Sequence, residues 1–148
     1  MKIFVDTNVY LDLIANRPEF VEGARLLCMA ASFDDLELWI STQSVTDADY
    51  ILRGPGVRDQ ARRAMASSLR LFRLCGTHAL DCEKALTDGW PDVEDCLIAH
   101  SAKRIGADAI VTRDIKGFER SSIPAYSPTQ LMELLRTEHG LEYESISW

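Results

Sequence analysis

The chain has 148 residues, of which 47% are hydrophobic and 26% are charged, a composition ordinary for a globular protein with a full core. No apolar run approaches the roughly 18 residues of a membrane helix, and the first residues do not resemble a signal peptide. We therefore expect one domain over residues 1–148, in the cytoplasm and without a membrane. The net charge of −7 argues against a protein that coats nucleic acid non-specifically.

Strand-like and helical segments alternate along the chain. Short apolar runs predict strands at 2–5, 37–41, 71–75, 109–112 and 124–126. Helices are predicted at 8–15, 18–32, 44–53, 57–69, 78–87, 92–105 and 128–138, with Pro18 in the first turn of the second. Residues 140–148 form a tail of unassigned order. Such alternation predicts an α/β fold of three layers, in which helices cover both faces of a central parallel sheet.

Acidic residues occupy positions that this fold would gather at one sheet edge. Asp6 directly follows the first strand, and Asp114 follows the strand at 109–112. Sites in parallel sheets form beyond the carboxyl ends of the strands, so these two loops are expected to meet. The predicted helices add further acids. The full set is Asp6, Asp47, Asp92, Asp95 and Asp114.

Several carboxylates in one place repel one another unless cations neutralise them. Oxygen ligands suit hard ions, so a cluster of this kind indicates Mg²⁺ or Mn²⁺. Taken singly, each acid also has a simpler explanation. Asp6 is a good helix N-cap, Asp92 and Asp95 complement a helix dipole, and Asp114 fits an ordinary loop. Glu94 is left out of the site, because helical geometry is expected to turn it away.

The helix at 44–53 offers two aspartates, and its periodicity favours the second. Val45, Ala48 and Leu52 form its apolar stripe, Asp49 falls within that stripe, and Asp47 lies roughly opposite. Periodicity alone therefore predicts that Asp49 points inward. This leaves the choice between the two carboxylates open at this stage.

Residues 53–73 contain six arginines and only one acid, Asp59. They form either a solvated helix face or a surface that guides a polyanion. The arginines are Arg53, Arg58, Arg62, Arg63, Arg70 and Arg73. Two bound Mg²⁺ ions would also bring the net charge from −7 to −3, so the acidic total does not exclude a polyanionic substrate.

The cysteines are expected to be buried free thiols, because they include no Cys-x-x-Cys pair and no histidine at zinc-ligand spacing. They are Cys28, Cys75, Cys82 and Cys96. None of the three histidines shows catalytic spacing, and His100 is expected to be structural.

Four segments, in order, resemble the motifs of the PIN domain, a family of metal-dependent nucleases that includes the VapC-type toxins. They are Val-Asp-Thr-Asn-Val at 5–9, Thr-Asp-Ala-Asp-Tyr-Ile-Leu at 46–52, Pro-Asp-Val-Glu-Asp-Cys-Leu-Ile-Ala at 91–99, and Ile-Val-Thr-Arg-Asp-Ile-Lys-Gly-Phe at 110–118. The resemblance runs from residue 2 to about residue 135. Its register selects Asp47 rather than Asp49. The sequence departs from the family in having aspartate where the second motif often has glutamate.

The resemblance implies an Mg²⁺- or Mn²⁺-dependent ribonuclease. Its metal ligands would be Asp6, Asp95 and Asp114, with Asp47 direct or through water and Asp92 as an accessory acid. Asn8 or Thr7, and Thr112 of the fourth motif, would position ligand or substrate, while Arg53, Arg113 and Lys116 would contact phosphate. The family also implies RNA rather than DNA, a cognate antitoxin and a homodimer.

Two other classes remain open at this stage. A phosphoryl-transfer enzyme of the haloacid-dehalogenase type also has an aspartate after its first strand, but it needs a second one where Asn8 stands. A non-catalytic α/β binding or regulatory domain, including a PIN domain without activity, would use the acidic pocket only to bind. Metal-binding measurements on Asp6→Asn and Asp95→Asn variants would separate this class from a working enzyme.

Overall fold

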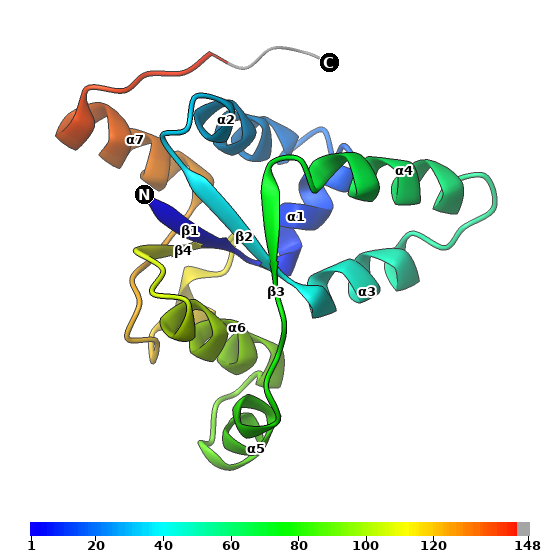
Figure 1. Cartoon of the computed structure of the whole chain (residues 1–148), viewed down its shortest axis with the longest axis vertical. Helices are drawn as coiled ribbons and strands as arrows, with labels where there is room; N and C mark the ends of the chain where they lie inside the picture. Colours follow the sequence, from blue (N-terminus) through cyan, green and yellow to red (C-terminus); the bar gives the residue numbers. More distant parts are fainter. Residues whose placement is uncertain (145–148) are drawn as a thin grey trace.

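The computed structural model describes residues 1–144 and holds a parallel five-stranded sheet between two layers of helices (Figure 1). The strands are β1 (Lys2–Val5), β2 (Glu37–Ser41), β3 (Phe72–Cys75), β4 (Ala109–Val111) and β5 (Ala125–Tyr126). The helices are α1 (Thr7–Ile14), α2 (Val21–Ser32), α3 (Thr42–Ile51), α4 (Arg58–Ser68), α5 (Ala79–Thr87), α6 (Val93–Arg104) and α7 (Pro128–His139), with a 3₁₀ helix η1 (Ile115–Phe118). The predicted three-layer α/β fold is confirmed. Of the tail expected at 140–148, residues 145–148 lie outside the described part.

Both faces of the sheet are buried, which explains why its strands read as continuous apolar runs. Successive side chains of β1 point to opposite faces. Ile3 and Val5 join a core cluster with α1, α2, α4 and α7, whereas Phe4 joins a second cluster with α6. Helix α5 packs on α6 through Ala85 and Leu97 rather than on the sheet. It therefore forms the outer end of the molecule on that side (Figure 1).

Local chemistry sets several helix ends. Ser127 accepts a hydrogen bond from the Gln130 amide at 3.1 Å and begins α7, followed by Pro128 as predicted. Gly106 has φ +68°, a left-handed conformation that glycine adopts without strain, and it stands just after α6 as expected.

The placement of Pro18 in the first turn of a helix is wrong, because α2 begins only at Val21. Asn16 has φ +49°, which turns the chain after α1. The Arg17 carbonyl then accepts hydrogen bonds from the amides of Phe20 and Val21, so Pro18 lies in a tight turn before the helix. Helix η1 was not predicted either, since its four residues give no periodic signal.

The strands are ordered β3-β2-β1-β4-β5, so from β1 the chain adds β2 and β3 on one side and β4 and β5 on the other. The topological switch point therefore lies between β1 and β4. At such a switch point the loops that follow the two strands diverge and leave a crevice at the carboxyl edge. The Asp6 amide still donates to the Val111 carbonyl at 2.9 Å, which holds the two strand ends together. Helix α6 brings its amino terminus to the same edge, and α3 brings Asp47 there. The fold thus supplies one place where four segments can meet.

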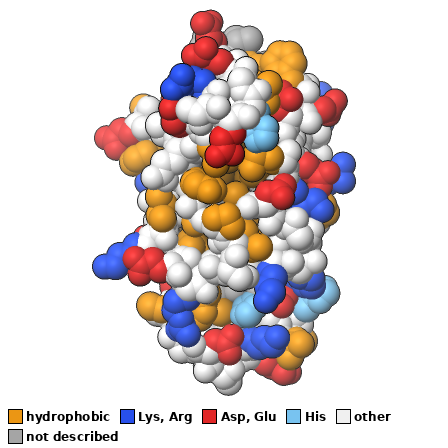
Figure 2. All heavy atoms as spheres, turned by 90° about the vertical axis from the view of Figure 1, so that its left-hand side faces the viewer, with side chains coloured by type: hydrophobic (Ala, Val, Ile, Leu, Met, Phe, Trp, Pro, Cys, Tyr) orange, Lys and Arg blue, Asp and Glu red, His pale blue; other side chains and the backbone are white. Residues whose placement is uncertain are grey.

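The short strand β5 forms the edge of the sheet beside β4. On the side of the molecule that Figure 2 presents, hydrophobic side chains gather near the middle and charged ones lie mostly around them. Ile123, Ala125 and Tyr126 are partly buried against the core.

No described helix is both long enough and apolar enough to cross a membrane.

Candidate metal centre

Six carboxylates line one cavity of about 630 Å³ at the switch point. They come from the end of β1, from α3, from the start of α6 and from the loop after β4. Among the described residues that line this cavity, none is lysine or arginine. All five acids predicted from the sequence are present, together with one that was not. The set is Asp6, Asp47, Asp92, Glu94, Asp95 and Asp114.

Asp6 stands at the N-cap position of α1 but does not cap it with its side chain. Its Oδ2 instead accepts a hydrogen bond from the Thr112 hydroxyl at 2.7 Å, and only 4% of the residue is exposed. Burial raises the pKa of Asp6 to about 6, which the Thr112 hydrogen bond opposes and the nearby Glu94 and Asp114 reinforce. The simple capping explanation is therefore wrong for this residue.

Asp95 and Asp114 approach each other over Gly117. A methyl group on Gly117 would lie 2.5 Å from Asp95 Oδ2 and 3.0 Å from Asp114 Oδ2, so both carboxylates use the space of the missing side chain. Burial raises the pKa of Asp95 to about 7, and repulsion from Asp6, Asp92 and Asp114 adds to the effect. Asp92 also accepts a hydrogen bond from the Asp95 amide at 3.0 Å, so it caps α6 while lining the cavity.

The structure places Asp47, and not Asp49, at the cavity. Asp49 points toward α4, where it accepts hydrogen bonds from Arg58 at 2.6 Å and from Arg62 at 2.6 Å. The helical-wheel argument misleads here because Asp49 meets the arginines of α4, whereas the apolar residues of its stripe pack on the core. The same ion pairs engage two of the six arginines between residues 53 and 73 within the protein.

The exclusion of Glu94 is wrong. Glu94 lies in the first turn of α6, and its Oε1 accepts a hydrogen bond from the Thr7 hydroxyl at 2.6 Å. Thr7 also shares a hydrogen bond of 2.8 Å with the Ser44 hydroxyl of α3. The first turn of α6 lies beside the start of α1. Glu94, which the helical phase of α6 predicts to point away from the site, therefore contacts Thr7. Predicting this contact requires knowing that the first turns of α6 and α1 lie side by side.

The predicted substrate-contacting residues lie at different distances from the acids. Asn8 lines the cavity, and its Oδ1 accepts from the Arg113 amide at 3.2 Å. Lys116 lines an adjoining hollow that shares Asp92, Asp95 and Asp114. Arg53 stacks over Tyr50, a residue of the cavity wall, at 4.1 Å.

Arg113 does not line the cavity. Its guanidinium pairs with the buried Asp12 at 2.9 Å and lies over the ring of Phe20 at 4.1 Å. Its side chain thus holds the loop after β4 against α1, while its backbone amide faces Asn8.

The donor set fits a hard divalent cation. It is made of carboxylate oxygens with hydroxyl and amide groups, and no protein cation among the lining residues balances the charge. Burial is the main cause of the raised pKa values of Asp6 and Asp95, and repulsion from the neighbouring carboxylates adds to it.

The fold and the cavity define a parallel α/β domain with an acidic site at the switch point of its sheet. A PIN-domain family profile matches residues 2–116. The chain therefore belongs to the PIN-domain family, a family of nucleases, and the resemblance found in its motifs is confirmed. None of the curated proteins matches it.

Similar solved structures confirm the fold. The DNA-bound VapBC of Salmonella typhimurium has a TM-score of 0.67 at 19% identity, covering 86% of this chain and 98% of that one. VapBC2 of Rickettsia felis, bound to a promoter DNA fragment, has a TM-score of 0.64 at 20% identity over 86% and 98%. VapC20 of Mycobacterium tuberculosis, described as a Sarcin-Ricin loop cleaving toxin, has a TM-score of 0.57 at 16% identity over 73% and 86%.

Proposed function

We propose that this protein is an Mg²⁺- or Mn²⁺-dependent endoribonuclease and the toxin of a toxin–antitoxin pair. The observation that carries the proposal is the convergence of six carboxylates from four segments on one open cavity. Membership in a family of nucleases supports hydrolysis of a phosphodiester bond. The same membership displaces the dehalogenase-type alternative.

The acids would divide the work by their position. Asp6, Asp95 and Asp114 would hold the ion, while Asp47, Asp92 and Glu94 would keep the cavity negative and order its water. A bound Mg²⁺ or Mn²⁺ would lower the pKa of water and offset charge on the phosphate. Thr112 fixes the orientation of Asp6, and Thr7 fixes that of Glu94, through the hydrogen bonds described above.

A few groups near the cavity suit an RNA strand. Tyr50 is 63% exposed at the cavity wall and offers an aromatic ring for stacking, with the Arg53 guanidinium 4.1 Å from the ring centroid. Lys116 stands beside the acids and is available to a phosphate. VapC20 among the similar structures is a cleaving toxin. We propose RNA as the substrate on these grounds, with Asn8 and Thr112 in positioning roles and Arg113 as a support of the loop.

The proposed partners follow from the neighbours. Two of the similar structures are VapBC complexes bound to DNA, which supports a cognate antitoxin for this chain. We further propose a homodimer and a cytoplasmic location, as expected from the resemblance and the composition.

The test is cleavage of structured and unstructured RNA by the purified chain with Mg²⁺ or Mn²⁺, with EDTA as the metal-free control. Asp6→Asn keeps the shape of the side chain and removes its charge, so it should abolish cleavage. Asp34→Asn is the matched control, because Asp34 is exposed and its φ of +62° suits asparagine. Metal-dependent cleavage kept by Asp34→Asn and lost in Asp6→Asn would establish the activity.

A metal-bound protein that leaves all RNA intact would favour the second function, a PIN-fold binding domain. Calorimetry then shows whether only the proposed ribonuclease activity is wrong or the proposed metal centre as well. Binding of Mn²⁺ by the natural chain but not by Asp6→Asn or Asp95→Asn would keep the metal centre and remove the ribonuclease activity. Equal binding by all three would remove both.

A further inference from the structure

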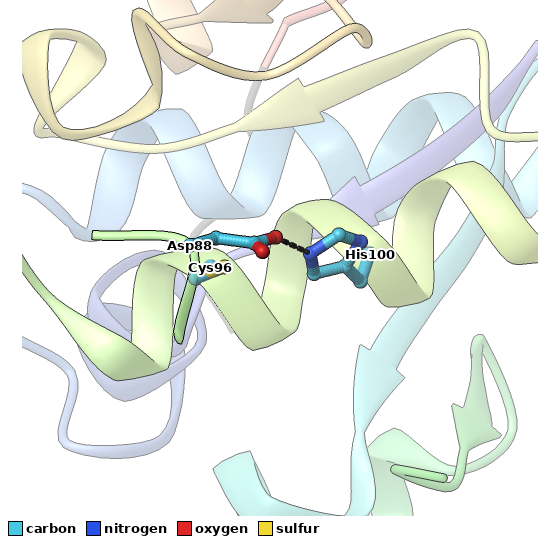
Figure 3. A group of neighbouring side chains, drawn as sticks. All are labelled: Asp88, Cys96 and His100. Carbon is cyan, nitrogen blue, oxygen red and sulfur yellow. Dashed lines mark hydrogen bonds and ion pairs between the residues drawn. The ribbon is translucent and has the colours of Figure 1, made fainter. Parts of the chain in front are cut away.

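A second cluster of metal-ligating groups lies outside the carboxylate cavity, between α5 and α6. One donor atom each from Asp88, Cys96 and His100 lies within 4.8 Å of the others. Figure 3 shows the three side chains beside one another, with the Asp88 carboxylate directed at the imidazole of His100, at 3.3 Å. The expectation that no histidine stands at ligand spacing from a cysteine is wrong, because four residues along a helix place Cys96 and His100 on one face.

We propose that these three residues bind one Zn²⁺ ion or a similar borderline metal. Thiolate, imidazole and carboxylate are the common protein ligands of zinc, whereas the oxygen-only cavity suits Mg²⁺ or Mn²⁺. Ligand atoms of a tetrahedral zinc site lie roughly 3.3–3.8 Å apart, given its bond lengths, so the cluster needs only a small contraction. Three protein ligands leave a fourth position for water.

The site is accessible and its parts are already held in place. The side chains of Asp88 and His100 are 40% and 25% exposed, and Cys96 lies buried beneath them. Arg120 donates hydrogen bonds to the backbone carbonyls of Asp88 at 2.8 Å and of Gly89 at 2.7 Å. These hydrogen bonds hold the backbone at Asp88 and Gly89 and do not use the Asp88 carboxylate, which stays available to an ion.

The position of this cluster indicates what the metal does. Asp88 stands at the C-cap of α5, and the other two ligands belong to α6. Since α5 packs on α6 and not on the sheet, a shared ion would fasten it to the body of the protein. Cys96 directly follows Asp95, so the same ion would also stabilise the first turns of α6, which carry acids of the cavity.

The test uses Co²⁺ as a spectroscopic substitute for Zn²⁺, because a cobalt–thiolate bond gives a charge-transfer absorption that oxygen ligands do not. The full chain should take up one equivalent of Co²⁺ with this band, and Zn²⁺ should displace it. Loss of a ligand should weaken binding by at least about tenfold. The ligand variants are Cys96→Ser, His100→Gln and Asp88→Asn.

Two controls keep the assignment specific. Cys82 is exposed on α5, so Cys82→Ser should retain the band, and Asp6→Asn should retain it because it alters only the cavity. If Cys96→Ser fails to fold by circular dichroism, His100→Gln and Asp88→Asn carry the test. A natural chain without the band, a band lost in Cys82→Ser or Asp6→Asn, or a band that both His100→Gln and Asp88→Asn retain at full affinity would overturn the site.

Discussion

At the scale of single residues, burial determines the chemistry of the cavity. Asp6 and Asp95 belong to a side-chain type that ionises near pH 4 in water, yet their pKa values rise to about 6 and about 7. Near neutral pH the metal-free cavity is thus partly protonated. A cation must displace these protons, so metal affinity should increase as the pH rises through this range.

The raised pKa values predict how stability depends on pH. Between about pH 4 and pH 7, folded Asp6 and Asp95 keep protons that the unfolded chain has released, so the free energy of unfolding of the metal-free protein falls as the pH rises. Asp6 alone accounts for about 3 kcal/mol at most. Asp6→Asn should therefore be more stable than the natural chain at pH 8 but not at pH 4. Urea unfolding in EDTA measures this difference, with Asp34→Asn as control; an equal difference at both pH values would contradict it.

Gly117 is predicted to matter through the space that it leaves empty. In Gly117→Ala the new methyl group would collide with Asp95 and Asp114 and push the two carboxylates apart. Mn²⁺ affinity in calorimetry should fall by about tenfold or more, as when groups that orient metal ligands are altered. Gly76→Ala is the control, because its methyl group would meet open space. Unchanged affinity in Gly117→Ala would mean that Gly117 does not set this geometry.

Sequence reasoning at this scale found Asp6, Asp92, Asp95 and Asp114 because strand ends and helix starts place them without detailed packing. The choice between Asp47 and Asp49 needed the family motif, since periodicity cannot tell which neighbour a helix face meets. Nothing in the sequence predicts the role of Gly117, although it lies within the fourth motif at 110–118.

At the scale of elements, the site depends on how the loop after β4 is held against α1. Asp12 of α1 has a side chain that is 2% exposed, and it pairs with Arg113 at 2.9 Å and with Arg17 at 3.3 Å. Arg113 directly precedes Asp114. This ion pair therefore links the position of a cavity acid to the helix that follows Asp6.

Asp12→Asn removes the charge that pairs with Arg113 and Arg17. Because burial raises the pKa of Asp12 and so offsets part of this loss, the free energy of unfolding should fall by at most about 2 kcal/mol. Mn²⁺ binding should also weaken, because the loop that carries Asp114 loses its anchor. Chemical denaturation and calorimetry measure the two effects. Glu133→Gln removes an exposed ion pair with Arg136 and should change stability little. An Asp12→Asn protein with natural stability and metal affinity would show that the pair is dispensable.

The elements themselves were largely predictable, because apolar runs and helix caps are local signals. The strands at 2–5 and 37–41 match β1 and β2, and Ser127 with Pro128 begins α7 as expected. The errors arose where non-local contacts decide. The start of α2 depends on a turn at Asn16, and the place of Glu94 depends on its hydrogen bond with Thr7 at the start of α1.

At the scale of the whole molecule, the cavity joins segments that are far apart in the chain. Residues from positions 6 to 114 meet there, so an ion bound by them should oppose unfolding of the entire domain and not of one loop. At a concentration 100 times its dissociation constant, Mn²⁺ should add about 2.7 kcal/mol to the free energy of unfolding. For a domain of this size that corresponds to a rise in melting temperature of roughly 5–10 °C.

This last prediction can be checked by calorimetric or fluorescence melting in a series of Mn²⁺ concentrations. Asp95→Asn and Asp114→Asn, which alter acids from different segments, should each abolish most of the rise, whereas Asp34→Asn should keep it. His100→Gln should also keep it, because His100 does not line the cavity. A rise that persists in both cavity variants would place the stabilising ion elsewhere and remove the thermodynamic basis of the proposed metal centre.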